Sequence, residues 1–141
     1  MRLLTWMLLL FCSHVFASDD VIPIKNSEPG QYSLTRQEAT WMFTMKTRFW
    51  NDGTRITVFY LDPTSRIHRK FCSEILGIHP DKFDQLVAAH INSGNASYFK
   101  LAQNKAEVYY KVGLLPGAIG YVDSDTIIIH GRGYVSELKV R

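Results

Sequence analysis

The chain has 141 residues, a hydrophobic content of 46% and an aromatic content of 13%, values typical of a packed globular domain and not of a disordered tail. Its 16 Lys+Arg and 13 Asp+Glu give a formal net charge of +3. That balance is too mild for a nucleic-acid-binding protein, and no Lys/Arg run is interleaved with aromatic residues. We therefore expect no nucleic acid among its partners.

The first 17 residues are predicted to form a cleaved signal peptide. Arg2 precedes an apolar run at residues 3–11, and residues 15–17 (VFA) place a small residue at the expected cut. The run is much shorter than the roughly 20 apolar residues of a membrane span. A lipidated Cys12 is the alternative, but the bulky Phe11 is unlike the small residue that normally precedes a lipidated cysteine. We expect export to the periplasm as a soluble protein.

Removal of residues 1–17 leaves 124 of the 141 residues, with 15 Lys+Arg against 13 Asp+Glu because Arg2 is lost. The sequence thus predicts one domain at residues 18–141 with one hydrophobic core. Cys72 is then the only cysteine, so no internal disulfide can form. Cys72 falls on the inward side of a predicted helix, which favours a buried, inert thiol over a nucleophile.

In chain order, the first predicted element is a strand at residues 21–25, placed at a sheet edge because it contains Pro23. Thr35 and Glu38 have the spacing of a capping box and predict a helix that continues through Phe43. A turn at residues 51–53 (NDG) then leads into a buried strand at residues 56–61.

The strand at residues 56–61 is followed by the most informative turn of the chain. Asp62 is predicted to cap a helix with Pro63 as its first residue, and the helix is predicted to end at Gly77. The positions predicted to face inward are Ile67, Phe71, Ile75 and Leu76.

A third helix is predicted from Pro80 to Gly94, and a fourth over residues 104–112, where Asn104 is a good cap with Glu107 three positions later. A turn at Pro116-Gly117 leads into another strand, and residues 126–129 and 134–140 are predicted as two more strands because they are rich in β-branched residues. Strands and helices roughly alternate, so the predicted fold class is α/β, a mixed sheet flanked by helices.

The predicted helix start after Asp62 is the candidate functional site. Free N–H groups near Thr64, Ser65 and Arg66 would lie at the positive end of the helix dipole, beside two hydroxyl groups and a guanidinium group. Such an arrangement suits a small oxyanion. An ordinary capped helix with a basic, solvated flank is the alternative interpretation.

No catalytic or metal-binding motif is evident in the sequence. The histidines after residue 17 have no histidine partner at helical spacing, and neither a G-x-S-x-G elbow nor a glycine-rich phosphate loop with its lysine is present. Asp62, Ser65 and His68 have the residue types of a catalytic triad, but a capping aspartate and a helical histidine explain them more simply. We expect no enzymatic activity, no metal and no cofactor.

Residues 21–123 resemble the periplasmic substrate-binding proteins of phosphate ABC transporters, and in particular a group of very short members of that family. The resemblance depends on the order and spacing of residues 34–38 (LTRQE), 42–43 (MF), 50–53 (WNDG), 55–71 and 116–122 (PGAIGYV), of which the last motif is the most specific.

This resemblance implies one lobe of a type 2 periplasmic-binding protein, and it implies phosphate as the ligand. In full-length relatives an Arg-x-Asp-Gly-Ser-Gly-Thr segment contributes to the phosphate site between two lobes. The matching positions here are Asp62, Thr64 and Ser65, whereas Tyr60 replaces the arginine and Arg66 the glycine after the serine. The first lobe of the family has no counterpart in this chain.

Two functions therefore remain open. The first is a non-enzymatic, periplasmic solute-binding domain that binds phosphate or a similar oxyanion weakly through Asp62, Thr64, Ser65 and Arg66. The second is an interaction module for proteins of the cell envelope that has kept the fold and lost the ligand. Partners implied by the first are an ABC permease, an envelope protein or a second copy of the chain that supplies the missing lobe.

We predict that export removes residues 1–17, because the short apolar run and the VFA motif together define one cut after Ala17. The intact mass of the exported protein tests this directly. A species that retains Met1, or one whose mass includes a lipid on Cys12, would contradict the prediction.

Overall fold

The computed structural model describes residues 20–28 and 33–141; the predicted signal peptide and Cys12 lie outside the described residues. The elements follow one another as β1 (Val21–Asn26), β2 (Ser33–Leu34), α1 (Arg36–Phe43), β3 (Thr57–Tyr60), α2 (Arg66–Lys70), η1 (Phe71–Leu76), α3 (Pro80–His90), η2 (Ile91–Asn95), η3 (Ala96–Tyr98), β4 (Phe99–Leu101), α4 (Lys105–Leu114), β5 (Ala118–Asp123), α5 (Ser124–His130), β6 (Val135–Glu137) and β7 (Lys139–Val140). The segment η1 is a π-helix that directly continues α2.

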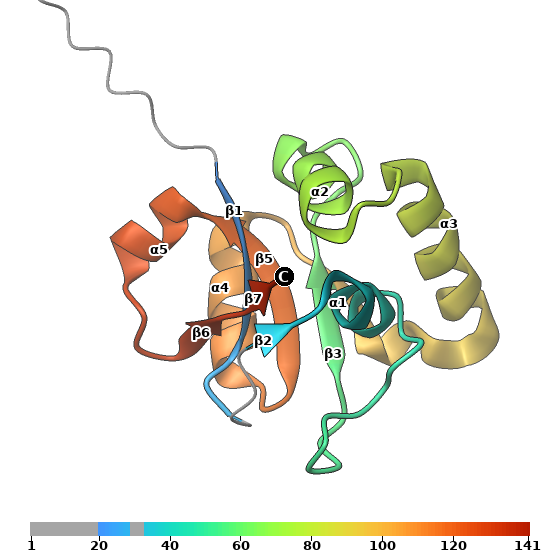
Figure 1. Ribbon diagram of the computed structural model, residues 1–141, viewed down its shortest axis with the longest axis horizontal. Coiled ribbons are helices and arrows are strands. Elements are labelled where there is room, and N and C mark those ends of the chain that lie inside the picture. The colour runs from blue at the N-terminus through green and yellow to red at the C-terminus, as the bar shows by residue number, and fades with distance from the viewer. Residues whose placement is uncertain (1–19, 29–32) are drawn as a thin grey trace, which may run out of the picture.

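The main sheet has five strands in the order β4-β3-β5-β1-β6 (Figure 1). β3 pairs in parallel with both β4 and β5, whereas β1 is antiparallel to its two neighbours, β5 and β6. β2 and β7 form a separate parallel pair. The predicted α/β class with a mixed sheet is therefore confirmed.

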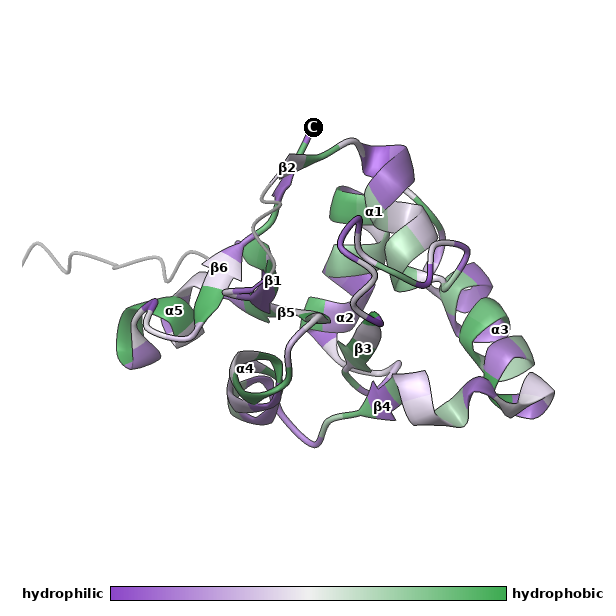
Figure 2. Ribbon diagram, turned by 90° about the horizontal axis from the view of Figure 1, so that it is seen from below, coloured by the Kyte–Doolittle hydropathy of each residue, from purple (hydrophilic) through white to green (hydrophobic). Residues whose placement is uncertain are grey.

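Helices cover both faces of the main sheet (Figure 2). α4 lies on one face, and α1, α2 and η1 lie on the other, with α3 outside them. The alternation of side chains along β5 matches these layers. Tyr121 stacks on Phe71 of η1 with ring centroids 4.0 Å apart, while Gly120 faces Val108 and Val112 of α4.

The two glycines of the PGAIGYV motif are required by close contacts. Gly117 has a φ of +82°, and a Cβ atom added there would lie 2.4 Å from the carbonyl oxygen of Arg55. A Cβ atom on Gly120 would lie 2.7 Å from Cγ1 of Val108. The motif thus lets β5 approach β3 on one side and α4 on the other.

Four local start and stop signals, those at Thr35, Gly77, Pro80 and Asn104, were predicted correctly. Glu38 and Thr35 form the capping box of α1, with the Thr35 N–H donating to Glu38 over 2.8 Å. Gly77 ends η1 with a φ of +69°, and Pro80 is the first residue of α3. Asn104 caps α4 by accepting a hydrogen bond from the Glu107 N–H.

The prediction that residues 21–25 form an edge strand is wrong. β1 lies between β5 and β6, so it is paired on both sides. The carbonyl oxygen of Pro23 accepts a hydrogen bond from the Leu138 N–H, 2.9 Å away, just beyond the end of the β6 pairing. In an antiparallel strand the N–H and C=O of one residue point to the same side. An N–H at position 23 would therefore also point to the end of the pairing between β1 and β6, where a missing donor costs little. Pro23 is tolerated for this reason.

The C-terminal region also differs from the prediction. Residues 126–129 belong to helix α5, because Asp123 caps it by accepting hydrogen bonds from the Thr126 N–H and hydroxyl at 2.9 and 2.6 Å. Residues 134–140 divide at Leu138 into β6 and β7, which belong to different sheets. The short strand β4, at the edge of the main sheet, was not predicted.

Replacement of Phe71 by alanine is expected to lower the free energy of unfolding by about 3–5 kcal/mol, the usual range for a large aromatic side chain lost from a core. Phe71 is fully buried, stacks on Tyr121 and contacts Phe43 edge-on at 4.7 Å. Urea unfolding measures the change. Ile128→Ala is the control, because Ile128 is 78% exposed; an equal loss in both variants would contradict this account of the core.

Candidate functional site

The candidate site lies at the carboxyl-terminal edge of the parallel strands. β3, β4 and β5 run in the same direction, and they are followed by α2, α4 and α5, respectively. Figure 1 shows α2 and α5 at the same end of the sheet. In open α/β sheets ligands bind at this edge, near the point where successive connections leave in opposite directions. Here β4 and β5 lie on opposite sides of β3, so that point is at the end of β3.

The turn after β3 is closed by Asp62. The Asp62 carboxylate accepts hydrogen bonds from the N–H and the hydroxyl of Thr64 at 2.8 and 2.6 Å, and the Asp62 carbonyl oxygen accepts one from the Ser65 N–H at 2.9 Å. The two bonds from Thr64, chiefly that from its hydroxyl, hold the pKa of the Asp62 carboxyl below its usual value. Asp62 is therefore the closing residue of a turn.

The prediction that Asp62 caps the helix is consequently wrong. α2 begins at Arg66, and its cap is Ser65, whose hydroxyl oxygen accepts a hydrogen bond from the His68 N–H at 3.5 Å. The helix starts three residues later than predicted because Asp62 bonds to Thr64 within the turn instead of to a helix amide. Pro63 lies in the turn, outside the helix.

The structure brings the four predicted ligands together on one turn, but in different roles. Asp62, Thr64 and Arg66 are exposed, and Ser65 is half-buried. The Thr64 hydroxyl is directed at Asp62, whereas Ser65 accepts at its hydroxyl oxygen and retains its proton for donation. The first amides of a helix have no acceptor within the helix. The prediction of free N–H groups at Thr64 and Ser65 is wrong, because these groups donate to the carboxylate and the carbonyl oxygen of Asp62. The Ser65 hydroxyl, Arg66 and the first turn of α2 therefore form the part of the site suited to an anion.

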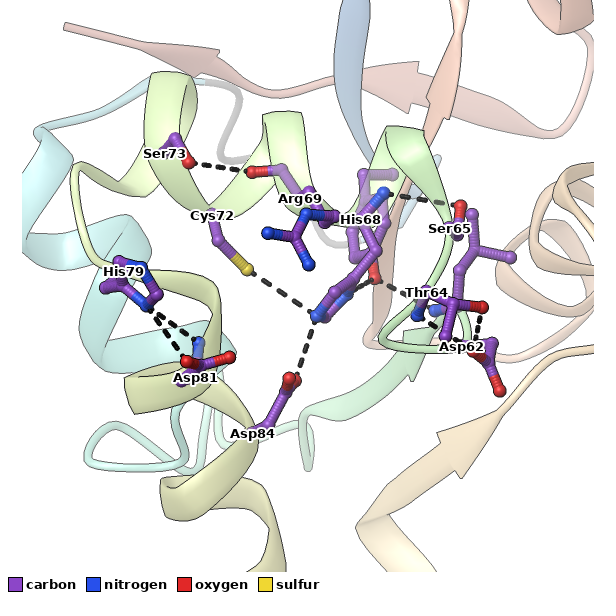
Figure 3. A network of polar contacts seen from close by, with 12 residues as sticks. Asp62, Thr64, Ser65, His68, Arg69, Cys72, Ser73, His79, Asp81 and Asp84 are labelled. Atoms are coloured by element: carbon purple, nitrogen blue, oxygen red, sulfur yellow. Dashed lines mark hydrogen bonds and ion pairs between the residues drawn. The ribbon is translucent and has the colours of Figure 1, made fainter.

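A buried polar network supports this turn from below, and sequence reasoning missed it (Figure 3). His68 contacts the Tyr121 hydroxyl through Nδ1 at 2.5 Å and the Asp84 carboxylate through Nε2 at 2.9 Å. The Leu61 N–H donates to the same Tyr121 hydroxyl over 2.9 Å. His68 and Cys72 are four residues apart on the inward face of α2 and η1, which is the signal that could have indicated a buried histidine.

The directions of these hydrogen bonds follow from their donors. Tyr121 accepts from Leu61, so its own proton is donated to Nδ1 of His68. Nε2 then carries the proton of the neutral ring and donates it to Asp84. Burial lowers the pKa of His68, and the Asp84 carboxylate opposes that shift. Burial also holds the pKa of Tyr121 well above its usual value.

The order aspartate, histidine, hydroxyl is that of a catalytic triad, but this network is built for support. His68 and Tyr121 are fully buried, so a substrate has no access to the hydroxyl. The Sγ atom of Cys72 lies 3.7 Å from Nε2 of His68, yet burial raises the pKa of the thiol to about 12. Cys72 is thus a protonated, buried thiol, in agreement with its predicted inward position. The predicted alternative of a triad of Asp62, Ser65 and His68 does not form, because the Ser65 hydroxyl contacts the His68 backbone N–H, while the ring nitrogens of His68 contact Tyr121 and Asp84.

Within residues 20–28 and 33–141, no group of three or more His, Cys, Asp or Glu is arranged to hold a metal ion. Over the same residues, no helix combines the length and the apolar character that crossing a membrane requires.

The mixed sheet, the helices on both faces and the turn at the end of β3 form an arrangement that is also found in solved proteins of phosphate transport. The fold is similar to PstS from Borrelia burgdorferi, with a TM-score of 0.61 at 18% identity over 87% of this chain and 47% of that one. It is also similar to a Clostridium perfringens protein of the phosphate ABC transporter substrate-binding type with bound phosphate, with a TM-score of 0.64 at 18% identity, covering 86% and 45%. A third neighbour is an ABC-type phosphate transport receptor from Vibrio cholerae, with a TM-score of 0.62 at 12% identity, covering 86% and 46%.

These comparisons confirm the expected resemblance at the level of the fold. The chain spans less than half the length of each of these neighbours. No protein-family model and no curated protein matches the sequence.

The free energy of unfolding is expected to fall as the pH is lowered below 6.5, the ordinary pKa of histidine. Because folding lowers the pKa of His68, the unfolded chain binds more protons in this range, and stability rises with pH. Urea unfolding between pH 8 and pH 5, with NMR titration of the His68 ring, measures both effects. A His68 pKa at or above 6.5 in the folded protein would contradict the prediction.

Asp84→Asn sharpens this experiment, because the amide oxygen can still accept from Nε2 but carries no charge. The pKa of His68 should fall further, so the loss of stability should extend to lower pH. Asp81→Asn is the matched control, since Asp81 lies one turn earlier on α3, is 75% exposed and pairs with His79 instead.

Proposed function

We propose that this chain is a periplasmic, non-enzymatic solute-binding domain that binds phosphate or a similar small oxyanion at the turn between β3 and α2. The observation that carries the proposal is the start of α2 at Ser65, immediately after the closed turn at Asp62. Amides of a first helical turn point outward and attract anions, and this one adds the Ser65 hydroxyl and the Arg66 guanidinium.

The fold supports the same proposal. The Clostridium perfringens neighbour holds phosphate, and the Vibrio cholerae neighbour is a phosphate transport receptor. Positions matched by the resemblance, Asp62, Thr64 and Ser65, occupy the turn that the sheet places at its carboxyl edge.

Binding by this chain alone should be weak. Three of the four proposed ligands are exposed, and hydrogen bonds between charged groups weaken in a medium of high dielectric constant. Lys105 also lies at this edge, but its ammonium group pairs with Asp123 at 2.5 Å. Tight capture would require a second surface that excludes water, from an ABC permease, an envelope protein or a second copy of this chain.

A second candidate function is an interaction module that has kept the fold without the ligand. One observation favours it: the Thr64 hydroxyl, which would otherwise donate to an anion, donates to Asp62. Tyr60 and Arg66 also replace the arginine and the glycine of the family segment.

Titration calorimetry of the mature protein with phosphate, sulfate and acetate separates the two functions. The first predicts binding of the tetrahedral anions at millimolar concentrations. Ser65→Ala should weaken that binding by roughly 1–3 kcal/mol, the range for a hydrogen bond to a charged group. Ser73→Ala is the matched control, because Ser73 lies on η1 outside the turn and its hydroxyl donates to the Arg69 carbonyl oxygen at 2.9 Å.

Equal affinities in Ser65→Ala and the wild type would place the anion elsewhere. An absence of binding by phosphate and sulfate at millimolar concentrations would overturn the first function and leave the interaction module.

A further inference from the structure

The strongest unexplained feature is an apolar surface along α4, on the side of the sheet away from α2. Its exposed members are Leu114 (77%), Tyr134 (69%), Leu101 (56%), Tyr110 (53%) and Leu115 (38%). Figure 2 shows α4 on this face of the sheet, with α1, α2 and α3 on the other. Contiguous exposed apolar residues of this kind mark contact surfaces in soluble proteins.

This surface is a ridge between two hollows. A groove of about 450 Å³ lies on one side of α4 and is lined by Phe59, Lys100, Leu101, Glu107, Lys111, Leu114 and Leu115. A second hollow of about 190 Å³ is lined by Tyr109, Tyr110, Gly113, Leu114 and Tyr134. Leu114 lines both, so it forms the crest between them.

The charges of the larger groove have both signs. Glu107 and Lys111 lie one helical turn apart on α4, and Lys100 lies beside them on β4. Within the part of the chain that the structure describes, neither lysine forms an ion pair. A groove that binds a membrane surface or a nucleic acid would carry charges of one dominant sign. A groove with charges of both signs instead fits a partner whose charges lie in the complementary order.

We propose that this α4 surface is the interface of a homodimer, in which the α4 helices of two copies pack antiparallel across a two-fold axis. A ridge beside a groove is self-complementary under such an axis, because each ridge enters the groove of the other copy. The same axis, passing close to the middle of α4, places Glu107 of each copy opposite Lys111 of the other. Both shape and charge therefore match a second copy of this chain.

The proposed interface is separate from the proposed anion site. Leu114 and Leu115 are at the C-terminal end of α4, and the turn at Asp62 is at the carboxyl edge of the sheet, where α4 begins. Leu101, at the margin of the surface, pairs with Tyr60 at the carboxyl end of β3. Because α4 lies on the sheet face away from α2, dimerisation through α4 leaves the turn at Ser65 and Arg66 uncovered. It can be tested without any ligand, so failure of one proposal leaves the other intact.

Sedimentation equilibrium of the mature protein across micromolar concentrations tests the dimer, with circular dichroism to verify folding of every variant. The wild type should dimerise, and Leu114→Asp should raise the dimer dissociation constant at least about tenfold by placing a charge on the crest. Ile128→Asp, on α5, is the matched control and should leave the dimer unchanged, since Ile128 is equally exposed at 78%.

A charge reversal tests the antiparallel arrangement. Lys111→Glu should weaken the dimer by placing two glutamates together, and Glu107→Lys combined with Lys111→Glu should restore it. A monomeric wild type at 100 µM, a dimer insensitive to Leu114→Asp, or a double variant as weak as the single one would each overturn the proposal. A wild type that stays monomeric and binds an envelope protein through Leu114 would also overturn the proposal.

Discussion

The hydroxyl group of Tyr121 is the constraint on which the carboxyl edge of the sheet depends. It accepts the Leu61 N–H at the end of β3 and contacts Nδ1 of His68 in the first turn of α2. The ring itself stacks on Phe71. Because a buried polar group must be paired, strand and helix can be joined only in the arrangement that satisfies this hydroxyl. The position of α2 over β5 follows from it.

The exposed turn and the buried network thus have different physical roles. Asp62 closes the turn through hydrogen bonds within three residues, in contact with water. His68, in the first turn of α2, is fully buried and is anchored to the buried Tyr121 and to Asp84, whose side chain is 30% exposed. This buried support holds the Ser65 hydroxyl and the first turn of α2 in place, but it does not exclude water from them. The fold can therefore position this turn without giving it a high affinity for an anion.

The two faces of the sheet are covered by helices in different ways. On one face α1, α2 and η1 bury the rings of Phe43, Phe71 and Tyr121 against one another. On the other, α4 packs closely over Gly120 and keeps a row of exposed apolar side chains on its outer side. Contact with another chain is one way to bury this row.

The sequence by itself determined the features that depend on residues within one or two helical turns. The capping box of Thr35, the stop at Gly77, the start of α3 at Pro80 and the cap at Asn104 all form as their local patterns indicate. The ordered motifs also predicted the resemblance that the comparisons confirm at the level of the fold. Only the tertiary structure determined the features in which contacts between residues distant in the sequence compete with local preferences. Pro23 lies inside the sheet because β6 ends beside it. The helix at residues 126–129, in contrast, has a local cap, Asp123, that sequence reasoning missed. His68 is a buried connector because Asp84 and Tyr121, 16 and 53 residues away, meet its two ring nitrogens, and no local pattern encodes contacts at such separations.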